Sequence, residues 1–356
     1  MRRAILIVLG FLAVVTAGLY LFRGQIALRA VQIGAQRAMT RDAIATLPDG
    51  LHVVLCGAGG PLPDPERSGP CVAVIADGSM YIVDAGSGGA RNLLRWQLLP
   101  GHIDAVFLTH FHSDHIDGLG ELALLRWTTG NHRSPLPVIG PEGVQEVVAG
   151  FNRAYAADHR FRSAHHGEKV TPSSGAGMVP RPFAPPKDRL GARVWRDGDL
   201  EVTMFGVEHA PVRPAVGYRF DYRGRSVVIS GDTSKSENLA YFARNADLLV
   251  HEALDSKMIA VTEAVARETG NLPRAQIMAD VPEYHTTPVE AAEVAATAGV
   301  DHLLYYHIVP PLLLPGLDVV FLEGTAEAYD GPITLGVDGT MLSLPAGSDA
   351  ITVSEF

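Results

Sequence analysis

Cysteine is almost absent from this chain. Its 356 residues include two, Cys56 and Cys71. Two thiols are too few for a thiolate-bound zinc site, and they cannot form the disulfide framework of a small secreted fold. They can be two small buried side chains, or they can form a single bridge if the domain is exported to an oxidising compartment. The sequence leaves the pairing open.

Positive charge is also scarce. Lys and Arg number 29 against 39 Asp and Glu, which gives a net charge of −10. A field of this sign repels nucleic acid unless a strong basic patch offsets it. The nearest candidate, residues 151–170, mixes three arginines and a lysine with Asp158 and Glu168, a mixture more typical of a solvated surface than of an anion-binding rim. Charge therefore argues against a nucleic-acid partner.

Charge is missing altogether from one N-terminal run. Residues 4–22 are 19 uncharged positions that follow Arg2 and Arg3. As a helix they would be about 28 Å long, close to the thickness of a bilayer core. Because the apolar run continues past Ala17, we interpret residues 1–23 as a signal anchor, a transmembrane helix, in preference to a cleaved signal peptide. The paired arginines favour a cytoplasmic N-terminus and a periplasmic or extracellular body.

The rest of the chain has the composition of a large folded domain, since 47% of all residues are hydrophobic. We expect a stalk over 24–49, one domain over 50–345 and a C-terminal tail over 346–356. Within the domain, residues 171–188 hold five prolines and two glycines and are expected to form an irregular loop. Val- and Ile-rich strands occur in two series, each followed by helices. This order predicts an α/β fold of four layers, αββα, with two sheets packed face to face.

One short stretch carries most of the chemistry. The sequence "FLTHFHSDHIDGLGEL", 107–122, places His110, His112, Asp114 and His115 within six positions after an apolar strand. His110 and His112 are two positions apart in extended chain, so their side chains can point the same way. Zinc accepts imidazole nitrogen and carboxylate oxygen, but a catalytic zinc does not take four ligands from so short a run. The stretch therefore predicts two metals and requires ligands from elsewhere.

Three later residues can complete such a site. His209, Asp232 and His307 each come just after or at the end of an apolar strand. With the H-x-H-x-D-H motif at 110–115 complete and these three residues in order, the chain resembles the metallo-β-lactamase superfamily. The resemblance implies two Zn²⁺ ions, or other divalent metals, and a metal-bridging hydroxide as nucleophile. It assigns His110, His112 and His209 to one metal, Asp114, His115 and His307 to the second, Asp232 to a bridge between them, and Asp84 to bracing the histidine loop.

Within this superfamily the chain is most similar to the ribonuclease Z and arylsulfatase-like branch, over about residues 50–310. The similarity rests on "LCGAGGPLPDPERSGPCVAV" at 55–74, "HEA" at 251–253 and "YHTTPVEAAEVAATAGVDHLLYYH" at 284–307. The branch implies that His285 and Glu252 form a proton-donating couple. The catalytic candidates are therefore Asp114, His285 and Glu252. The helix after His285 is predicted locally, with Thr287 as its N-cap in a capping box.

One departure from the branch bears on the substrate. In ribonuclease Z the arm that grips transfer RNA lies between the third metal histidine and the bridging aspartate. Here 22 residues lie between His209 and Asp232, and they have the pattern of a plain hairpin. We therefore expect a small anionic phosphate or sulfate ester as substrate, and we do not expect nucleic acid.

Several alternatives stay open. One is a ribonuclease Z-like RNA 3′-end endonuclease without the arm, and another is a lactone or β-lactam hydrolase. A non-catalytic metal-binding membrane protein is a third, which the complete ligand set disfavours. The oligomeric state is also open, a homodimer included. Five further histidines match no ligand position and are expected to be structural: His52, His102, His132, His251 and His302.

Overall fold

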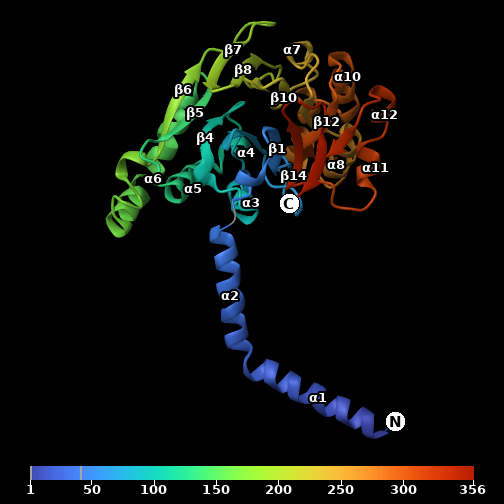
Figure 1. Ribbon diagram of the computed structural model, residues 1–356. Helices are drawn as coiled ribbons and strands as arrows, with labels where there is room; N and C mark the ends of the chain where they lie inside the picture. Colours follow the sequence, from blue (N-terminus) through green and yellow to red (C-terminus); the bar gives the residue numbers. More distant parts are fainter. Residues whose placement is uncertain (1, 41) are drawn as a thin grey trace. The chain divides into compact units, whose positions relative to one another are not determined.

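The computed structural model describes residues 2–40 and 42–356, and it divides the chain into two compact units, 1–43 and 44–356 (Figure 1). The first unit consists of helices α1 (Arg2–Leu21) and α2 (Arg23–Thr40). In the described ranges, no helix taken alone combines the length and hydropathy needed to cross a membrane. α1 and α2 together reach that threshold, with a bend of 66° at the break between them. The signal anchor over residues 1–23 stays a prediction.

The second unit contains two sheets. The first sheet has the strand order β15-β14-β1-β2-β3-β4-β5-β6. The strands from β3 to β6 are mutually parallel, and the others pair antiparallel. Their bounds are β1 (Gly50–Gly57), β2 (Cys71–Ala76), β3 (Ser79–Val83), β4 (Ile103–Phe107), β5 (Leu136–Pro141), β6 (Met178–Phe183), β14 (Thr340–Pro345) and β15 (Thr352–Glu355).

The second sheet has the strand order β13-β12-β11-β10-β9-β8-β7. Its strands β10 to β13 are parallel, and β7 to β10 are antiparallel neighbours. Their bounds are β7 (Ala192–Asp197), β8 (Leu200–Gly206), β9 (Val216–Tyr222), β10 (Arg225–Ile229), β11 (Leu248–Leu254), β12 (His302–Val309) and β13 (Ile333–Leu335).

The two sheets pack face to face through one apolar core. Val53 and Phe107 of the first sheet share this core with Phe220 and Val250 of the second. The Phe107 and Phe220 rings lie 5.5 Å apart in an edge-to-face arrangement. Central strands such as β1 and β12 are buried along their whole length, because helices cover their outer faces.

Helices form the two outer layers, and Figure 1 shows them on opposite sides of the sheets. The predicted αββα sandwich is therefore confirmed. The helices of the first half are α3 (Gly89–Arg95), α4 (Ser113–Ile116), α5 (Leu119–Gly130) and α6 (Val144–His166). Those of the second half are α7 (Glu237–Phe242), α8 (Ser256–Glu268), α9 (Leu272–Asp280), α10 (Pro288–Ala298), α11 (Leu317–Phe321) and α12 (Thr325–Ala328).

Two local expectations differ from the structure. The residues expected to be a tail, 346–356, include β15, which pairs with β14 and adds an edge strand to the first sheet. The proline-rich segment 171–188 contains β6, whose partner is β5 on one side only. Proline is tolerated there because an edge strand needs backbone donors on one side only. The two cysteines, whose pairing the sequence left open, form a disulfide between β1 and β2.

Candidate metal centre

The histidine loop leaves the end of β4 and is fixed by one buried carboxylate. Asp84, directly after β3, accepts hydrogen bonds from the backbone N–H and hydroxyl of Thr109, both at 2.8 Å, and from Nδ1 of His115 at 2.8 Å. Asp84 is fully buried and has φ +58°, in the left-handed region that non-glycine residues seldom adopt. The backbone is therefore held in an uncommon conformation that aims this carboxylate at the loop, which is the contact expected of a bracing residue.

A tight turn after the loop brings α4 close to β3. Gly118 donates its N–H to the Ala85 carbonyl at 2.8 Å, and a Cβ at this glycine would lie 2.5 Å from the Gly86 carbonyl oxygen. A side chain there would push α4, which carries Asp114 and His115, away from the sheet. This close approach explains why the motif continues into glycine.

The second sheet contributes its polar residues one strand at a time. His209 follows β8, and Asp232 follows β10. His307 lies inside β12 at a register shift, opposite the step from Glu252 to Ala253 in β11, and has φ +47°. A bulge of this kind changes the direction of a side chain, so His307 turns toward the other residues of the site.

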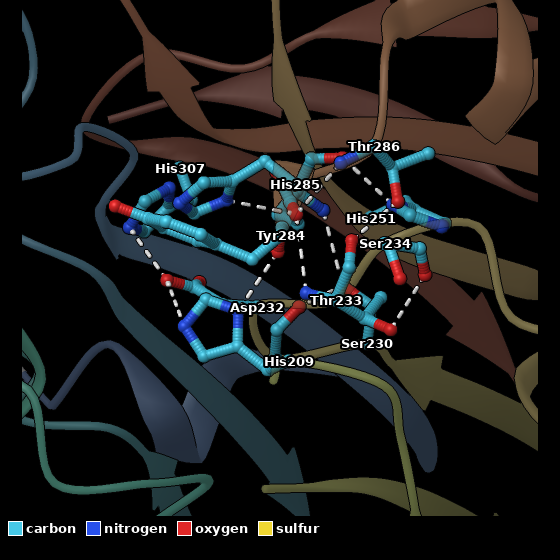
Figure 2. Close-up of polar contacts among 12 residues, drawn as sticks. His209, Ser230, Asp232, Thr233, Ser234, His251, Tyr284, His285, Thr286 and His307 are labelled. Carbon is cyan, nitrogen blue, oxygen red and sulfur yellow. Dashed lines mark hydrogen bonds and ion pairs between the residues drawn. The ribbon is translucent and has the colours of Figure 1, made fainter. Parts of the chain in front are cut away.

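These side chains converge on the Asp232 carboxylate, as Figure 2 shows for His209 and His307. Its Oδ2 atom lies 3.2 Å from Nε2 of His115 and 3.4 Å from Nε2 of His307. The same oxygen lies 3.8 Å from Nε2 of His110 and 4.0 Å from Nε2 of His209. One buried carboxylate oxygen is thus shared by four imidazoles from both sheets.

Ligand-type atoms within 4.8 Å of one another form two main groups. The first contains His110, His112, His209 and Asp232, and the second contains Asp114, His115 and His307. Asp114 Oδ2 lies 3.4 Å from Nε2 of His307 and 3.6 Å from Nε2 of His115. All seven residues predicted to bind metal therefore lie close together. Asp232, which was expected to bridge the two sets, falls in the first group, and it also forms a third group with His285 and His307.

Two histidine rings of the cluster donate hydrogen bonds through Nδ1, which leaves the lone pair of Nε2 directed into the cluster. Nδ1 of His115 donates to Asp84, and Nδ1 of His209 donates to the Tyr284 carbonyl at 2.8 Å. With Nδ1 protonated, a neutral imidazole presents an Nε2 lone pair to its other neighbour. Here that neighbour is Asp232, and His115 Nε2 and Asp232 Oδ1 are buried without a hydrogen-bond partner. Either a proton or a metal cation can lie between such a lone pair and a carboxylate, and the cluster of imidazole and carboxylate ligand atoms fits divalent metal ions.

The electrostatics of the protein alone agree with this fit. Burial opposes charge on His115, but the carboxylates of Asp232 and Asp84 outweigh it and hold the pKa of His115 well above its ordinary value. Burial likewise opposes the charge of Asp232, yet His115 and His307 keep its pKa well below the usual range. A proton on His115 supplies positive charge that bound metal would supply instead.

His285 and Glu252 form a buried pair beside the metal-ligand cluster. Nδ1 of His285 donates to Glu252 Oε1 at 3.0 Å, and the same oxygen accepts the N–H groups of Thr233 and Thr286, each at 3.1 Å. Burial disfavours the imidazolium, but Glu252 outweighs it and raises the pKa of His285 to about 9. A protonated His285 at neutral pH is suited to donate a proton.

The ligand atoms open into a cleft of about 280 Å³. His112, Asp114, Asp232, His285 and His307 line its polar side. Its other walls are apolar and come from the loop after β1, from α8 and α9, and from the end of β12. A substrate can therefore reach the cluster and His285 from one opening.

Sequence analysis missed Tyr284 as part of the site. Its carbonyl fixes the His209 ring, and its own ring lies 5.0 Å from the ring of His285 and lines the cleft. Its position next to His285 was the available signal, but an orienting carbonyl has no side-chain signature.

The five histidines expected to be structural lie outside every metal-type group in the described ranges. His251 Nδ1 donates a hydrogen bond to the Glu252 carbonyl at 2.7 Å. His52 contacts Ser343 at 2.8 Å, His132 contacts the Gly101 carbonyl at 2.8 Å, and His302 contacts Thr334 at 2.8 Å.

The sequence of this chain is similar to that of known proteins. The beta-lactamase superfamily domain matches residues 80–308. A ribonuclease Z from Mycolicibacterium paratuberculosis is 33% identical over 290 residues, which cover 81% of this chain and 96% of that protein. A ribonuclease Z from Mycolicibacterium gilvum is 34% identical over 290 residues, which cover 81% of this chain and 94% of that protein. The names of these relatives go against the expectation that nucleic acid is not a partner.

Solved structures show the same fold. Human tRNase Z, short form, has a TM-score of 0.57 and 22% identity, with 83% of this chain and 99% of that chain covered. The metallo-β-lactamase fold protein YhfI from Bacillus subtilis has a TM-score of 0.57 and 20% identity, with 83% of this chain and 100% of that chain covered. At these identities the likeness extends to the fold alone.

Proposed function

Since this chain belongs to the metallo-β-lactamase superfamily and is a metal-dependent hydrolase of ester bonds, we propose that the bond it cleaves is a phosphodiester, as in a ribonuclease Z-like enzyme. The observation that carries the proposal is the Asp232 carboxylate, which lies within 4.0 Å of four histidines and beside the His285–Glu252 pair. A dense ligand cluster next to a protonated imidazole supplies the two kinds of group that phosphodiester hydrolysis requires.

We assign the ligands in two sets. His110, His112 and His209 would hold one ion, Asp114, His115 and His307 would hold the other, and Asp232 would contact both. When bound, two divalent ions, Zn²⁺ in our proposal, supply Lewis-acid chemistry that makes water nucleophilic at neutral pH and stabilises negative charge on phosphoryl oxygens. The hydrogen bonds of Asp84 and of the Tyr284 carbonyl keep the histidine rings aimed inward.

His285 acts on the leaving group in this scheme. Glu252 holds Nδ1 of the imidazolium, so Nε2 carries the proton that can pass to the departing oxygen. Glu252 in turn is fixed by two backbone N–H groups, which leaves its orientation independent of the substrate. In this proposal the pair contributes general-acid catalysis, and His285 is not assigned to either metal ion.

Two substrate classes have specific support. The relatives are named ribonuclease Z, which favours RNA as the substrate. An RNA 3′-end endonuclease was one of the alternatives that the sequence left open. The hairpin of β9 and β10 favours a small phosphate or sulfate ester, because Arg223 and Gly224 alone join the two strands and no arm extends from them. Both classes use the same chemistry at the phosphorus or sulfur centre.

A substrate panel tests the proposal directly. The full-length protein would be assayed on a precursor transfer RNA, bis(nitrophenyl) phosphate, nitrophenyl sulfate, a lactone and a β-lactam, with Asp232→Ala as the control for contaminating enzymes. We expect both phosphodiesters, or the small one alone, to be cleaved by the wild type and not by the variant. Cleavage confined to the lactone or the β-lactam contradicts the proposal.

We also propose that α1 anchors the protein in a membrane and that the hydrolase domain lies on the oxidising side. The Cys56–Cys71 disulfide supports this location, since disulfides persist outside the reducing cytosol. A C-terminal reporter should behave as periplasmic or extracellular, and the protein should stay with membranes after a high-salt wash, which weakens electrostatic adhesion only. Recovery of the full-length chain in the soluble fraction contradicts the anchor.

A further inference from the structure

An apolar groove continues outward from the metal cleft. A second cavity of about 780 Å³ shares Leu62, Ile259 and Met278 with the cleft that holds the metal ligands. The cleft reaches Val309, and the groove begins at the next residue, Pro310. The two spaces therefore share a wall, and a molecule bound at the cluster can extend into the groove.

The lining of this groove is aliphatic. Apart from Thr262 and Arg274, every lining residue is apolar, and none is aromatic. Its outer part is exposed to solvent: Val261 is 66% exposed, Leu313 59% and Leu314 68%. Apolar side chains gathered around an open cavity mark a binding surface more often than a solvated one.

The chemistry of the groove selects its occupant. Single-stranded nucleic acid is bound by basic grooves with aromatic side chains on which bases stack, and this lining has one arginine and no aromatic ring. A flexible hydrocarbon chain needs neither feature, because its burial is driven by the apolar area removed from water. The volume also falls within the range of small-molecule sites.

We propose that the groove binds an aliphatic chain of the substrate, so that the preferred substrate is an amphiphilic phosphodiester with its phosphate at the metal cluster and its chain along α8 and the 310–316 loop. This inference rests on the phosphodiesterase chemistry proposed above, but not on RNA as the substrate. Substrates of this kind partition into membranes, where we propose that the N-terminal segment is held.

The test is a series of nitrophenyl alkyl phosphodiesters with ethyl, butyl, hexyl and octyl chains, assayed below their micellar concentrations. The full-length protein would be used in lipid nanodiscs, because free detergent would compete for the groove. Each methylene that becomes buried is worth up to about fourfold in kcat/KM. We expect the octyl diester to exceed the ethyl diester by at least about tenfold.

Two exposed positions provide the groove variant and its matched control. Leu314→Asp places a charge in the groove and should reduce the octyl-to-ethyl ratio to about one. Val319→Asp changes an exposed residue of α11, 71% exposed, that lines neither cavity, and should keep the ratio. Circular dichroism of both variants checks that they fold.

The outcomes separate this inference from the proposed function. Hydrolysis of every chain length at one rate overturns the groove and leaves the phosphodiesterase intact. Calorimetry of octylphosphonate and methylphosphonate binding tests the groove even if no diester is cleaved. Tighter binding of the octyl compound that is lost in Leu314→Asp supports the groove. Equal binding of the two compounds overturns it. If Leu314→Asp instead changes the mass of the protein in light scattering, the groove is a subunit interface, and the inference is wrong.

Discussion

The two sheets build the metal centre in different ways. The first sheet supplies His110, His112 and His115 from a single six-residue loop, which one carboxylate, Asp84, holds in place. The second sheet supplies one residue from each of three strands, and each is aimed by its own local device, such as the bulge at His307 or the Tyr284 carbonyl that fixes His209. A change in the first sheet should therefore disturb several ligands together, whereas a change in the second, apart from the shared Asp232, should affect the role of one residue at a time.

The largest loss of activity is expected from a change at Asp232, where the ligands of the two sheets meet. Asp232→Ala removes the carboxylate that lies within 4.0 Å of four histidines from both sheets, and the loss of several kcal/mol of stabilisation corresponds to roughly 10³- to 10⁵-fold in kcat/KM. Treatment of the wild type with a chelator should have the same effect, and added Zn²⁺ should restore activity to the wild type but not to the variant. Hydrolysis that resists both treatments would show that the cluster is structural.

His285 precedes α10 and lies outside the assigned ligand set, so its replacement should behave differently. His285→Ala should keep the metal content of the wild type and lose roughly 10²- to 10⁴-fold in rate with an alkoxide-like leaving group. Hydrolysis of nitrophenyl esters should change little, because nitrophenolate departs without a proton. His132→Ala is the matched control, since His132 lies outside the cluster.

Equal losses for good and poor leaving groups would assign His285 to binding the substrate anion. A fall in metal content in His285→Ala would make it a ligand, which is a real alternative because Asp232, His285 and His307 also offer atoms within 4.8 Å of one another.

The bracing carboxylate of the first sheet tests the other side of the comparison. Asp84→Asn can still accept the hydrogen bond from the Thr109 N–H. It replaces Oδ2, which accepts from the Thr109 hydroxyl and from His115 Nδ1, with an NH₂ group, and it loses its charge beside His115. Replacement of such an outer partner typically weakens metal binding by about 10- to 100-fold. Competition with a chelator should show this loss, and Asp197→Asn, whose carboxylate accepts a hydrogen bond from Tyr81 at the protein surface, should not show it. Unchanged metal affinity in Asp84→Asn would mean that the loop needs no brace.

The smallest effect is expected on pH dependence. Glu252 outweighs burial and raises the pKa of His285 to about 9, so the imidazolium is lost as pH rises through that value, or through a lower one when cations are bound nearby. The rate with a poor leaving group should fall over this alkaline range. Glu252→Gln removes the charge that raises the pKa, so the descending limb should move to lower pH. A limb in the same place, measured in the same buffers, would separate Glu252 from the titrating group.

The same contrast explains what the sequence could predict. The four ligand-type residues of the 110–115 loop lie close together in the sequence, so the loop could be recognised from the sequence alone. The αββα order follows from two series of apolar strands. His209, Asp232 and His307 were found because each follows or ends such a strand. The groove was not predicted, because α8, α9 and the 310–316 loop contribute scattered apolar residues that have no common period. Strand β15 was missed because Thr352–Glu355 is short and solvent-exposed at a sheet edge.

The most direct test of this account is the metal content of the full-length wild-type protein after growth with zinc. Elemental analysis should find close to two zinc ions per chain, and Asp232→Ala, prepared in parallel, should contain markedly less because it lacks the ligand that we assign to both ions. A metal-free wild-type protein, or a variant with the same metal content as the wild type, would contradict the account.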